Sequence, residues 1–431
     1  MKKPKSVKET IKKIKRRIHS KSFIERSRFD EKYFTRKRKM SFIPLIVFML
    51  NIIKQTLQKE LTNFIRNISK KDKNITKSAF SQSRMKLKHT AFIELNEVLL
   101  DDFYTDNNIN LWRGFRLLAI DGVKIQLPTS PPIIEEFGGS KNQNDLIAPL
   151  AQASTCYDLL NEMIINSEIS HCNTAEYTLA LKHLPKTKEN DLLIYDRGYD
   201  GMWFMFYHLC IKRNFVIRMA ENSIMQVRDF FSSDMESRII EVDKLHPDSK
   251  EQLKKLGIEF KSFKIRLVRV ILDNGEVEVL ATSLLNEFKY PASIFKKLYR
   301  RRWGIESNYD FLKNNIQIEN FTGLTPLSIK QDFFANLFIV NLQSLIAKDI
   351  QDEINEETKE RKHPYKFNRN LSLGFMKDRI IDVLMKNDDK YMEELKELFK
   401  IEPLPIRKNR KFPRIDHGPR RKYHINKKKA V

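Results

Sequence analysis

Cysteine and glycine are scarce in this sequence. Its 431 residues include 3 cysteines and 12 glycines, against 29 phenylalanines. Cys156, Cys172 and Cys210 cannot form an even set of disulfides and include no C-x-x-C pair, so we expect the reducing environment of the cytoplasm. His171 stands beside Cys172, but no second pair follows at ligand spacing, so zinc is not indicated. Little glycine and much phenylalanine indicate a packed globular protein.

Long apolar runs and several common catalytic motifs are also missing. The apolar run at residues 42–53 is interrupted by Pro44 and Asn51 and is too short to span a bilayer, so we interpret it as a buried helix. The residues before it are strongly basic, which does not fit a secretory signal. There is no H-E-x-x-H, P-loop or G-x-G-x-x-G, so neither zinc hydrolysis nor nucleotide use is indicated.

Acidic residues are outnumbered. Aspartate and glutamate total 55 against 79 lysines and arginines, a net charge of +24. Such an excess indicates a polyanionic partner. Basic blocks crowd residues 1–40 and the tail at 407–429, where Asp416 is the one acid. A membrane surface is the weaker alternative because the positive charge is spread along the whole chain, and we expect no membrane partner.

The most informative pattern lies between residues 299 and 313. No proline occurs from residue 292 to 325 and apolar residues recur at helical spacing, which predicts one helix. At about 100° per residue, four polar side chains would fall within roughly 60° of one another: Tyr299, Arg302, Glu306 and Lys313. This combination suits a phosphodiester backbone, with the carboxylate free to hold a hard metal ion. The alternative is a solvated helix face with i,i+4 ion pairs.

Two aspartates upstream each follow an apolar run typical of a buried strand. Residues 115–120 lead into Asp121-Gly122, and residues 191–195 lead into Asp196-Arg197-Gly198. A carboxylate in this position often presents an oxygen ligand at a sheet edge, although either aspartate alone could simply close a strand in a turn. If Glu306 joins them, three carboxylates converge, and they need cations.

These blocks resemble the catalytic blocks of bacterial insertion-sequence DDE transposases, most closely the insertion-sequence-four family. The first block runs from Asp121 to Pro128, and the second is Asp196-Arg197-Gly198-Tyr199. The third is Tyr-x2-Arg-x3-Glu-x6-Lys, which matches the family pattern at every spacing. Val123, where a small polar residue is expected, is a mild departure at a position that is not a proposed ligand.

The resemblance implies roles for six residues. Asp121, Asp196 and Glu306 would be catalytic and would hold two Mg²⁺ ions, with Mn²⁺ able to replace them. Tyr299, Arg302 and Lys313 would bind DNA. In the subgroup with this pattern, excision passes through a hairpin on the transposon end with a displaced base.

The resemblance also implies a function and its partners. The protein would bind double-stranded DNA at terminal inverted repeats, cleave it and join it to target DNA by cut-and-paste transposition. A homodimer would form in the synaptic complex, within a bacterial cytoplasm and associated with the nucleoid when bound to DNA. Two alternatives remain: a non-catalytic DNA-binding protein derived from a transposase, and a related ribonuclease-H-like nuclease that cuts without joining.

The order of predicted elements indicates an α/β fold. Strands are expected at 115–127, 148–157, 162–170, 191–195 and 215–219, with helices at 175–184 and 203–212, which is the order of a ribonuclease-H-like core. We divide the chain into a basic helical DNA-binding region (1–110), this catalytic core (111–219 and 291–350), a β-rich insertion (220–290) and a helical C-terminal region with a basic tail (351–431). Within the insertion, residues 260–272 and 276–285 flank Asp273-Asn274-Gly275, which predicts a hairpin.

Helices are expected in the remaining regions. The predicted ranges are 43–67, 78–86, 91–103, 329–350 and a pair within 371–399, while the charged residues 351–370 are expected to form a loop. Residues 75–84 form a short capped pattern with small polar residues and a basic flank. Such a helix suits the major groove of DNA, and a surface helix of a small bundle is the alternative.

Overall fold

The structure is a computed structural model, and it describes residues 7–36, 40–53, 55–68, 75–105, 109–141 and 147–407. The predicted basic tail therefore lies almost entirely outside the described residues. The chain forms two compact units. A helical unit comprises Met1–Ile109, Lys124–Ala151 and Phe311–Val431, and a sheet unit comprises Asn110–Val123 and Gln152–Asp310.

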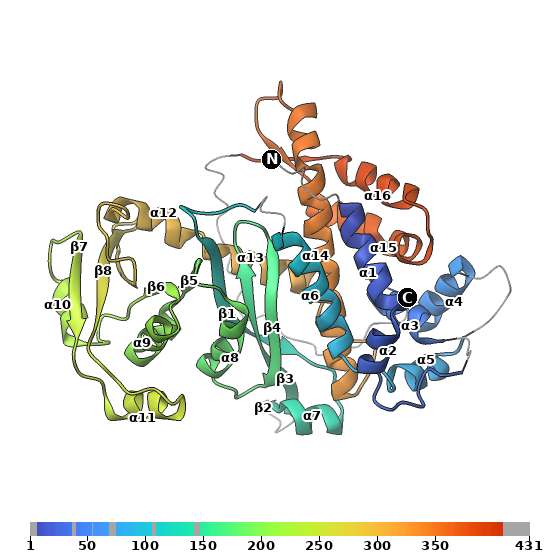
Figure 1. Cartoon of the computed structure of the whole chain (residues 1–431), viewed down its shortest axis with the longest axis horizontal. Helices are drawn as coiled ribbons and strands as arrows, with labels where there is room; N and C mark the ends of the chain where they lie inside the picture. Colours follow the sequence, from blue (N-terminus) through green and yellow to red (C-terminus); the bar gives the residue numbers. More distant parts are fainter. Residues whose placement is uncertain are drawn as a thin grey trace. The chain divides into compact units, whose positions relative to one another are not determined.

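The helical unit is built around one long helix, α14 (Pro326–Glu357). Thr325 caps its start through a reciprocal pair of hydrogen bonds with Ser328, and Pro326 occupies the first turn, where its missing N–H costs nothing. Several helices pack against α14 (Figure 1): α1 (Val7–His19), α3 (Phe42–Leu50), α6 (Thr90–Thr105), α7 (Pro131–Phe137), α15 (Arg369–Met385) and α16 (Lys390–Lys400).

The apolar stretch of α14 meets the length and composition criterion for a membrane span, the one helix in the described ranges that does. However, 83% of that stretch is buried inside the protein, as in the core helix of a soluble protein. Its apolar composition is therefore accounted for by packing. The remaining helices of this unit are α2 (Lys21–Ser27), α4 (Leu57–Ile68) and α5 (Lys77–Arg84).

The predicted capped helix at 78–86 is confirmed as α5, whose start is capped by Thr76. Arg84 at its end, part of the predicted basic flank, is buried instead of facing solvent. Its guanidinium donates to Gln331 Oε1 at 2.9 Å and forms an ion pair with Asp332 at 2.8 Å. Arg84 therefore connects α5 to the start of α14 and is not available to DNA.

The sheet unit is a mixed sheet. Its strands are β1 (Arg116–Gln126), β3 (Ile147–Asp158), β4 (Met163–His171), β5 (Asp191–Tyr195), β6 (Asn214–Arg218), β7 (Ser237–Val242), β8 (Phe263–Ile271) and β9 (Val277–Thr282). They pair in the order β3-β1-β5-β6-β9-β8-β7, with β4 paired to β3. The steps from β1 to β5 and from β5 to β6 are parallel, and those from β6 through β9 and β8 to β7 are antiparallel. In the helical unit, β2 (Gly139–Lys141) pairs with the start of β3.

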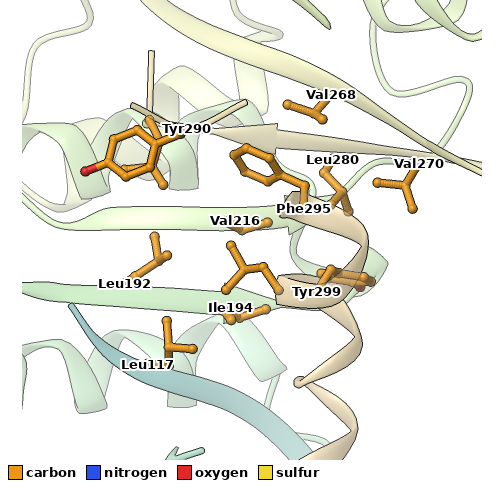
Figure 2. Close-up of a cluster of buried hydrophobic side chains, with 12 residues drawn as sticks. Leu117, Leu192, Ile194, Val216, Val268, Val270, Leu280, Tyr290, Phe295 and Tyr299 are labelled. Atoms are coloured by element: carbon orange, nitrogen blue, oxygen red, sulfur yellow. The ribbon is translucent and has the colours of Figure 1, made fainter. Parts of the chain in front are cut away.

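Both faces of the sheet are covered by helices, because alternate residues of a strand point to opposite faces. On one face, Leu192 and Ile194 of β5 join a buried cluster with Phe295 of α12 (Phe295–Arg300), as Figure 2 shows. On the other face, the ring of Tyr195 contacts those of Phe204 and His208 of α9 (Met202–Cys210). The mixed α/β prediction is confirmed.

Two local predictions were wrong. The single helix expected at 43–67 is two, α3 and α4, because the chain turns extended at Asn51. The loop expected from residue 351 begins later, because α14 continues to Glu357. The hairpin at Asp273-Asn274-Gly275 is confirmed as β8 and β9, with Gly275 at φ +87°. Through β9 they extend the central sheet, with α10 (Met225–Phe231) and α11 (Pro247–Lys255) in the connections.

Candidate active site

Asp121 and Asp196 are brought side by side by strand pairing. The parallel register of β1 and β5 matches Ala119 with Ile194. Two residues further on, Asp121 lies within β1, which continues to Gln126, and Asp196 directly follows the end of β5. Both carboxylates are therefore presented where the pairing of β1 with β5 ends, at the carboxyl end of β5. The expectation that the two strands bring these aspartates together is met within the sheet unit.

Each aspartate accepts a hydrogen bond from the backbone beside it. Asp121 Oδ1 accepts from Gly122 N at 2.8 Å, and Asp196 Oδ1 accepts from Gly198 N at 2.8 Å, which fixes the short turn at Arg197–Tyr199. The pKa of Asp121 is raised to about 6, chiefly by burial, and the negative charges of Asp196 and Glu176 add to the rise. Negative charge is therefore concentrated at this edge of the sheet.

Arg302 connects Asp121 to Glu306. Its Nη2 donates to Glu306 Oε1 at 2.7 Å, and its Nη1 lies 3.8 Å from Asp121 Oδ2. The Arg302 side chain is 11% exposed, so its charge acts in a partly desolvated site. In this structure the positive charge of Arg302 stands between the two carboxylates, where a metal cation would also be attracted.

The predicted single helix across residues 299–313 was wrong. Helix α12 ends at Arg300, residues 301–302 form a break, and α13 (Trp303–Phe311) follows. The segment Leu312–Ile316 is then a π-helix. Tyr299 and Arg302 still contact each other across this break, with the guanidinium carbon 5.9 Å from the centroid of the tyrosine ring. Arg302 and Glu306, four residues apart in the sequence, are in direct contact.

Tyr299 and Lys313 belong to different units of the structure. Tyr299 belongs to the buried cluster on the sheet and is 6% exposed (Figure 2). Its hydroxyl has no hydrogen-bond partner among the described residues. Lys313 belongs to the helical unit, where its Nζ donates to Lys124 O at 2.7 Å and lies 3.5 Å from Glu319 Oε1.

Several contributors to the site were not predicted. Tyr309 Oη donates to the carbonyl oxygen of Asp121 at 2.7 Å, and Ser154 Oγ donates to the same oxygen at 3.1 Å. These contacts fix the backbone of Asp121. Tyr309 lies three residues after Glu306, a helical spacing that could have indicated a shared face. Glu176, at the start of α8 (Glu176–His183), follows no recognisable motif.

A cavity of about 590 Å³ opens beside α12 in the sheet unit. Tyr299, Arg302 and Trp303 line it, together with the ion pair of Arg218 and Glu278 at 3.0 Å. Trp303 is 47% exposed, unusual for a large aromatic side chain. The cavity thus combines aromatic faces with positive charge, the combination that binds bases and phosphates.

The donor set fits a hard divalent cation. Asp121, Asp196 and Glu306 offer only carboxylate oxygens, the ligands preferred by Mg²⁺ and Mn²⁺. Within the described ranges, no three ligating side chains are already close enough to enclose an ion. Like-charged carboxylates repel one another, so an open arrangement is expected without a cation between them.

Comparison with known proteins places these residues in a family. Residues 112–342 match the family described as "Transposase DDE domain". Over 328 residues the chain is 22% identical to "Transposase InsG for insertion sequence element IS4" of Escherichia coli (strain K12), covering 74% of this chain and 71% of that protein. A piggyBac transposase synaptic complex with hairpin DNA overlaps 93% of this chain and 86% of its own, at a TM-score of 0.48 and 9% identity, too slight a likeness to bear on the fold. The family match spans more than half of the sequence, and the chain belongs to the DDE transposases, a catalytic family.

Proposed function

We propose that this protein binds the terminal inverted repeats of a transposon and catalyses metal-dependent strand cleavage and strand transfer. The observation that carries the proposal is the convergence at one sheet edge. Asp121 and Asp196 share a parallel register, and Arg302 contacts both Asp121 and Glu306. A simple solvated helix face would not bring residues from β1, the end of β5 and α13 together.

We assign Asp121, Asp196 and Glu306 as ligands of two Mg²⁺ ions, which Mn²⁺ can replace. When bound, such ions polarise the phosphodiester and make an attacking water or 3′-hydroxyl more acidic. Arg302 exchanges its carboxylate partners for phosphate oxygens when DNA and metal arrive, because a guanidinium binds both anions through the same paired geometry. Lys313 binds a further phosphate, as the family resemblance implies.

The cavity beside α12 is assigned to the end of the transposon. Trp303 offers an exposed ring for stacking, and Arg302 offers positive charge beside it. The hydroxyl of Tyr299 is buried without a hydrogen-bond partner among the described residues, and a buried polar group normally has one. If excision passes through a hairpin with a displaced base, these residues act at that step.

We also assign a role to each of the larger regions of the chain. We assign a ribonuclease-H-like core to residues 111–219 and 291–350, interrupted by residues 220–290. Residues 1–110 bind the terminal repeats, and residues 351–431 add a helical region with a basic tail. Two ends must be joined in one synaptic complex, so we infer a homodimer on DNA, in the bacterial cytoplasm.

The proposal is tested with a supercoiled plasmid carrying the flanking inverted repeats, incubated with Mg²⁺ or with EDTA. We expect excision with Mg²⁺, none with EDTA and none for Asp196→Ala. Asp229→Ala, on the exposed face of α10, is the matched control and should behave as wild type. Tight end binding without cleavage by any variant would favour the non-catalytic alternative, and cleavage without joining would favour the nuclease.

A further inference from the structure

Glu176 lies close to both aspartates of the site. We propose that it is a fourth carboxylate of the metal site, which ligates a cation shared with Asp121 and Asp196. The inference rests on the proposed function, because it adds a ligand to that same site. It concerns a residue that lies outside the three sequence blocks and was not predicted.

The position of Glu176 is defined by two glycines. A Cβ atom placed on Gly122 would lie 2.6 Å from Gln152 Nε2 and 3.0 Å from Glu176 Oε1, and one placed on Gly198 would lie 3.6 Å from Glu176 Oε2. Gly122 directly follows Asp121, and Gly198 is two residues after Asp196. One carboxylate therefore faces both catalytic segments at once, one oxygen toward each.

The approach to Asp196 is especially close. The point beside Gly198 that lies 3.6 Å from Glu176 Oε2 also lies 3.0 Å from Asp196 Oδ1. Any side chain at this position would enter the space between the two carboxylates, so glycine keeps it open. Two like charges facing one space are unfavourable unless a cation or a proton lies between them. The space beside Gly198, between Asp196 Oδ1 and Glu176 Oε2, is therefore suited to a cation, whereas the amide of Gln152 lies at the corresponding point beside Gly122.

A second observation comes from Tyr199. Its side chain is fully buried, and its hydroxyl has no hydrogen-bond partner in the part of the chain that the structure describes. Tyr199 directly follows Gly198, and its ring lies 5.5 Å from that of Tyr177, the residue after Glu176. A buried hydroxyl without a partner costs about 1–3 kcal/mol. Water bound to a cation beside Glu176 would supply the missing partner.

The plainer explanation is that Glu176 only interacts with the positive end of α8, whose first turn it occupies. That role requires no particular direction of the side chain. The amide of Gln152 lies near Glu176 Oε1, but neither it nor the helix end explains why Glu176 Oε2 faces the same space as Asp196 Oδ1, nor why the buried Tyr199 hydroxyl lacks a partner. Ligation accounts for both observations.

The test is Mn²⁺ binding to the full chain without DNA, followed by electron paramagnetic resonance and calorimetry. The variants are Glu176→Gln, Glu176→Asp, Asp196→Asn and, as the matched control, Glu168→Gln on β4, whose native carboxylate pairs with Lys182 at 3.6 Å. We expect Glu176→Gln to raise the Kd for Mn²⁺ tenfold or more, Glu176→Asp to raise it less, and Glu168→Gln to leave it unchanged. Circular dichroism of each metal-free variant reports whether it is folded.

The outcomes separate this inference from the proposed function. Loss of affinity in Asp196→Asn but not in Glu176→Gln would overturn the fourth ligand and leave the catalytic triad in place. Equal affinity of Glu176→Asp and wild type, with weaker binding by Glu176→Gln, would show an effect of charge without ligation and would also overturn it. If Asp196→Asn binds Mn²⁺ as wild type does, the metal site itself is misassigned and both proposals fail.

Discussion

Arg302 is the side chain that most directly shapes the site at the level of single residues. It contacts Glu306 at 2.7 Å and approaches Asp121 at 3.8 Å, so it offsets negative charge before any metal binds. Arg302 therefore has different partners in the two states. In the free protein its guanidinium contacts carboxylates, and in the proposed complex with DNA it contacts phosphate instead.

Replacing Arg302 by alanine should slow strand cleavage by about 10- to 100-fold, equivalent to about 1–3 kcal/mol of lost charge-assisted contact. The effect is partial because the carboxylates that hold the metal remain. Single-turnover cleavage at saturating Mg²⁺ measures it. Arg301→Ala, the exposed neighbour, is the control and should lose less. Equal losses in the two variants would show that general positive charge matters, and not the position of Arg302.

Glu306→Gln should abolish strand cleavage and leave end binding intact. The amide has nearly the same shape as the carboxylate but neither its charge nor its affinity for a hard cation. Gel-shift titration measures binding, and a nicking assay on the same DNA measures cleavage. If nicking persists at the wild-type rate, Glu306 does not belong to the metal site.

At the level of elements, α8 is attached to the sheet through a buried histidine. His183 Nε2 lies 3.0 Å from Ser154 Oγ of β3, and its Nδ1 lies 2.9 Å from Asn166 Nδ2 of β4. Burial lowers the pKa of His183 to about 3. On the same face of the sheet, His208 of α9 is bonded to Tyr195 at 2.8 Å, and burial lowers its pKa to about 4.

These two histidines predict loss of stability in mild acid. In the unfolded chain each takes up a proton near pH 6.5, whereas in the folded protein each stays neutral down to its lowered pKa. Between about pH 6.5 and 4 the unfolded state binds more protons, so the free energy of unfolding falls as the pH falls, by about 1.4 kcal/mol per pH unit for each histidine. Urea unfolding from pH 7 to pH 5 measures the slope. In His183→Asn the slope should be about half as steep, and an unchanged slope would exclude His183 as a cause.

The elements also show what could and could not be predicted from sequence. The strands leading to Asp121 and Asp196 were predictable because buried parallel strands are continuous apolar runs. The break at residues 301–302 was not predictable, because the helical spacing of apolar residues continues across it. Tyr299 packs into the buried cluster on the sheet just before the break. The addition of β9, β8 and β7 to the central sheet was also not predictable, since pairing between distant strands leaves no local pattern. For the same reason Glu176 could be placed beside Gly122 and Gly198 only by the structure.

At the level of the whole molecule, basic residues exceed acidic ones by 24, so ion pairs with acidic side chains cannot account for all of them. Some basic side chains are paired within the fold, as Lys377 is with the buried Glu60 at 2.8 Å and the buried Arg84 is with Asp332 at 2.8 Å. Such residues contribute to the fold and not to DNA binding. The sequence concentrates further basic residues in the tail after Arg407, where Asp416 is the one acid.

End binding should therefore weaken steeply with salt, and the tail should account for part of that dependence. Each phosphate neutralised by lysine or arginine contributes about −0.9 to the slope of log K against log salt concentration on duplex DNA. A variant ending at Arg407 should bind the terminal repeats more weakly at low salt and with a shallower slope, because fewer counterions are released. Fluorescence anisotropy from 50 to 300 mM KCl measures both quantities, and the thermal unfolding midpoint serves as the control for folding. A slope equal to that of the full chain would show that the tail makes no phosphate contacts, so that the charges of the folded units alone bind the ends.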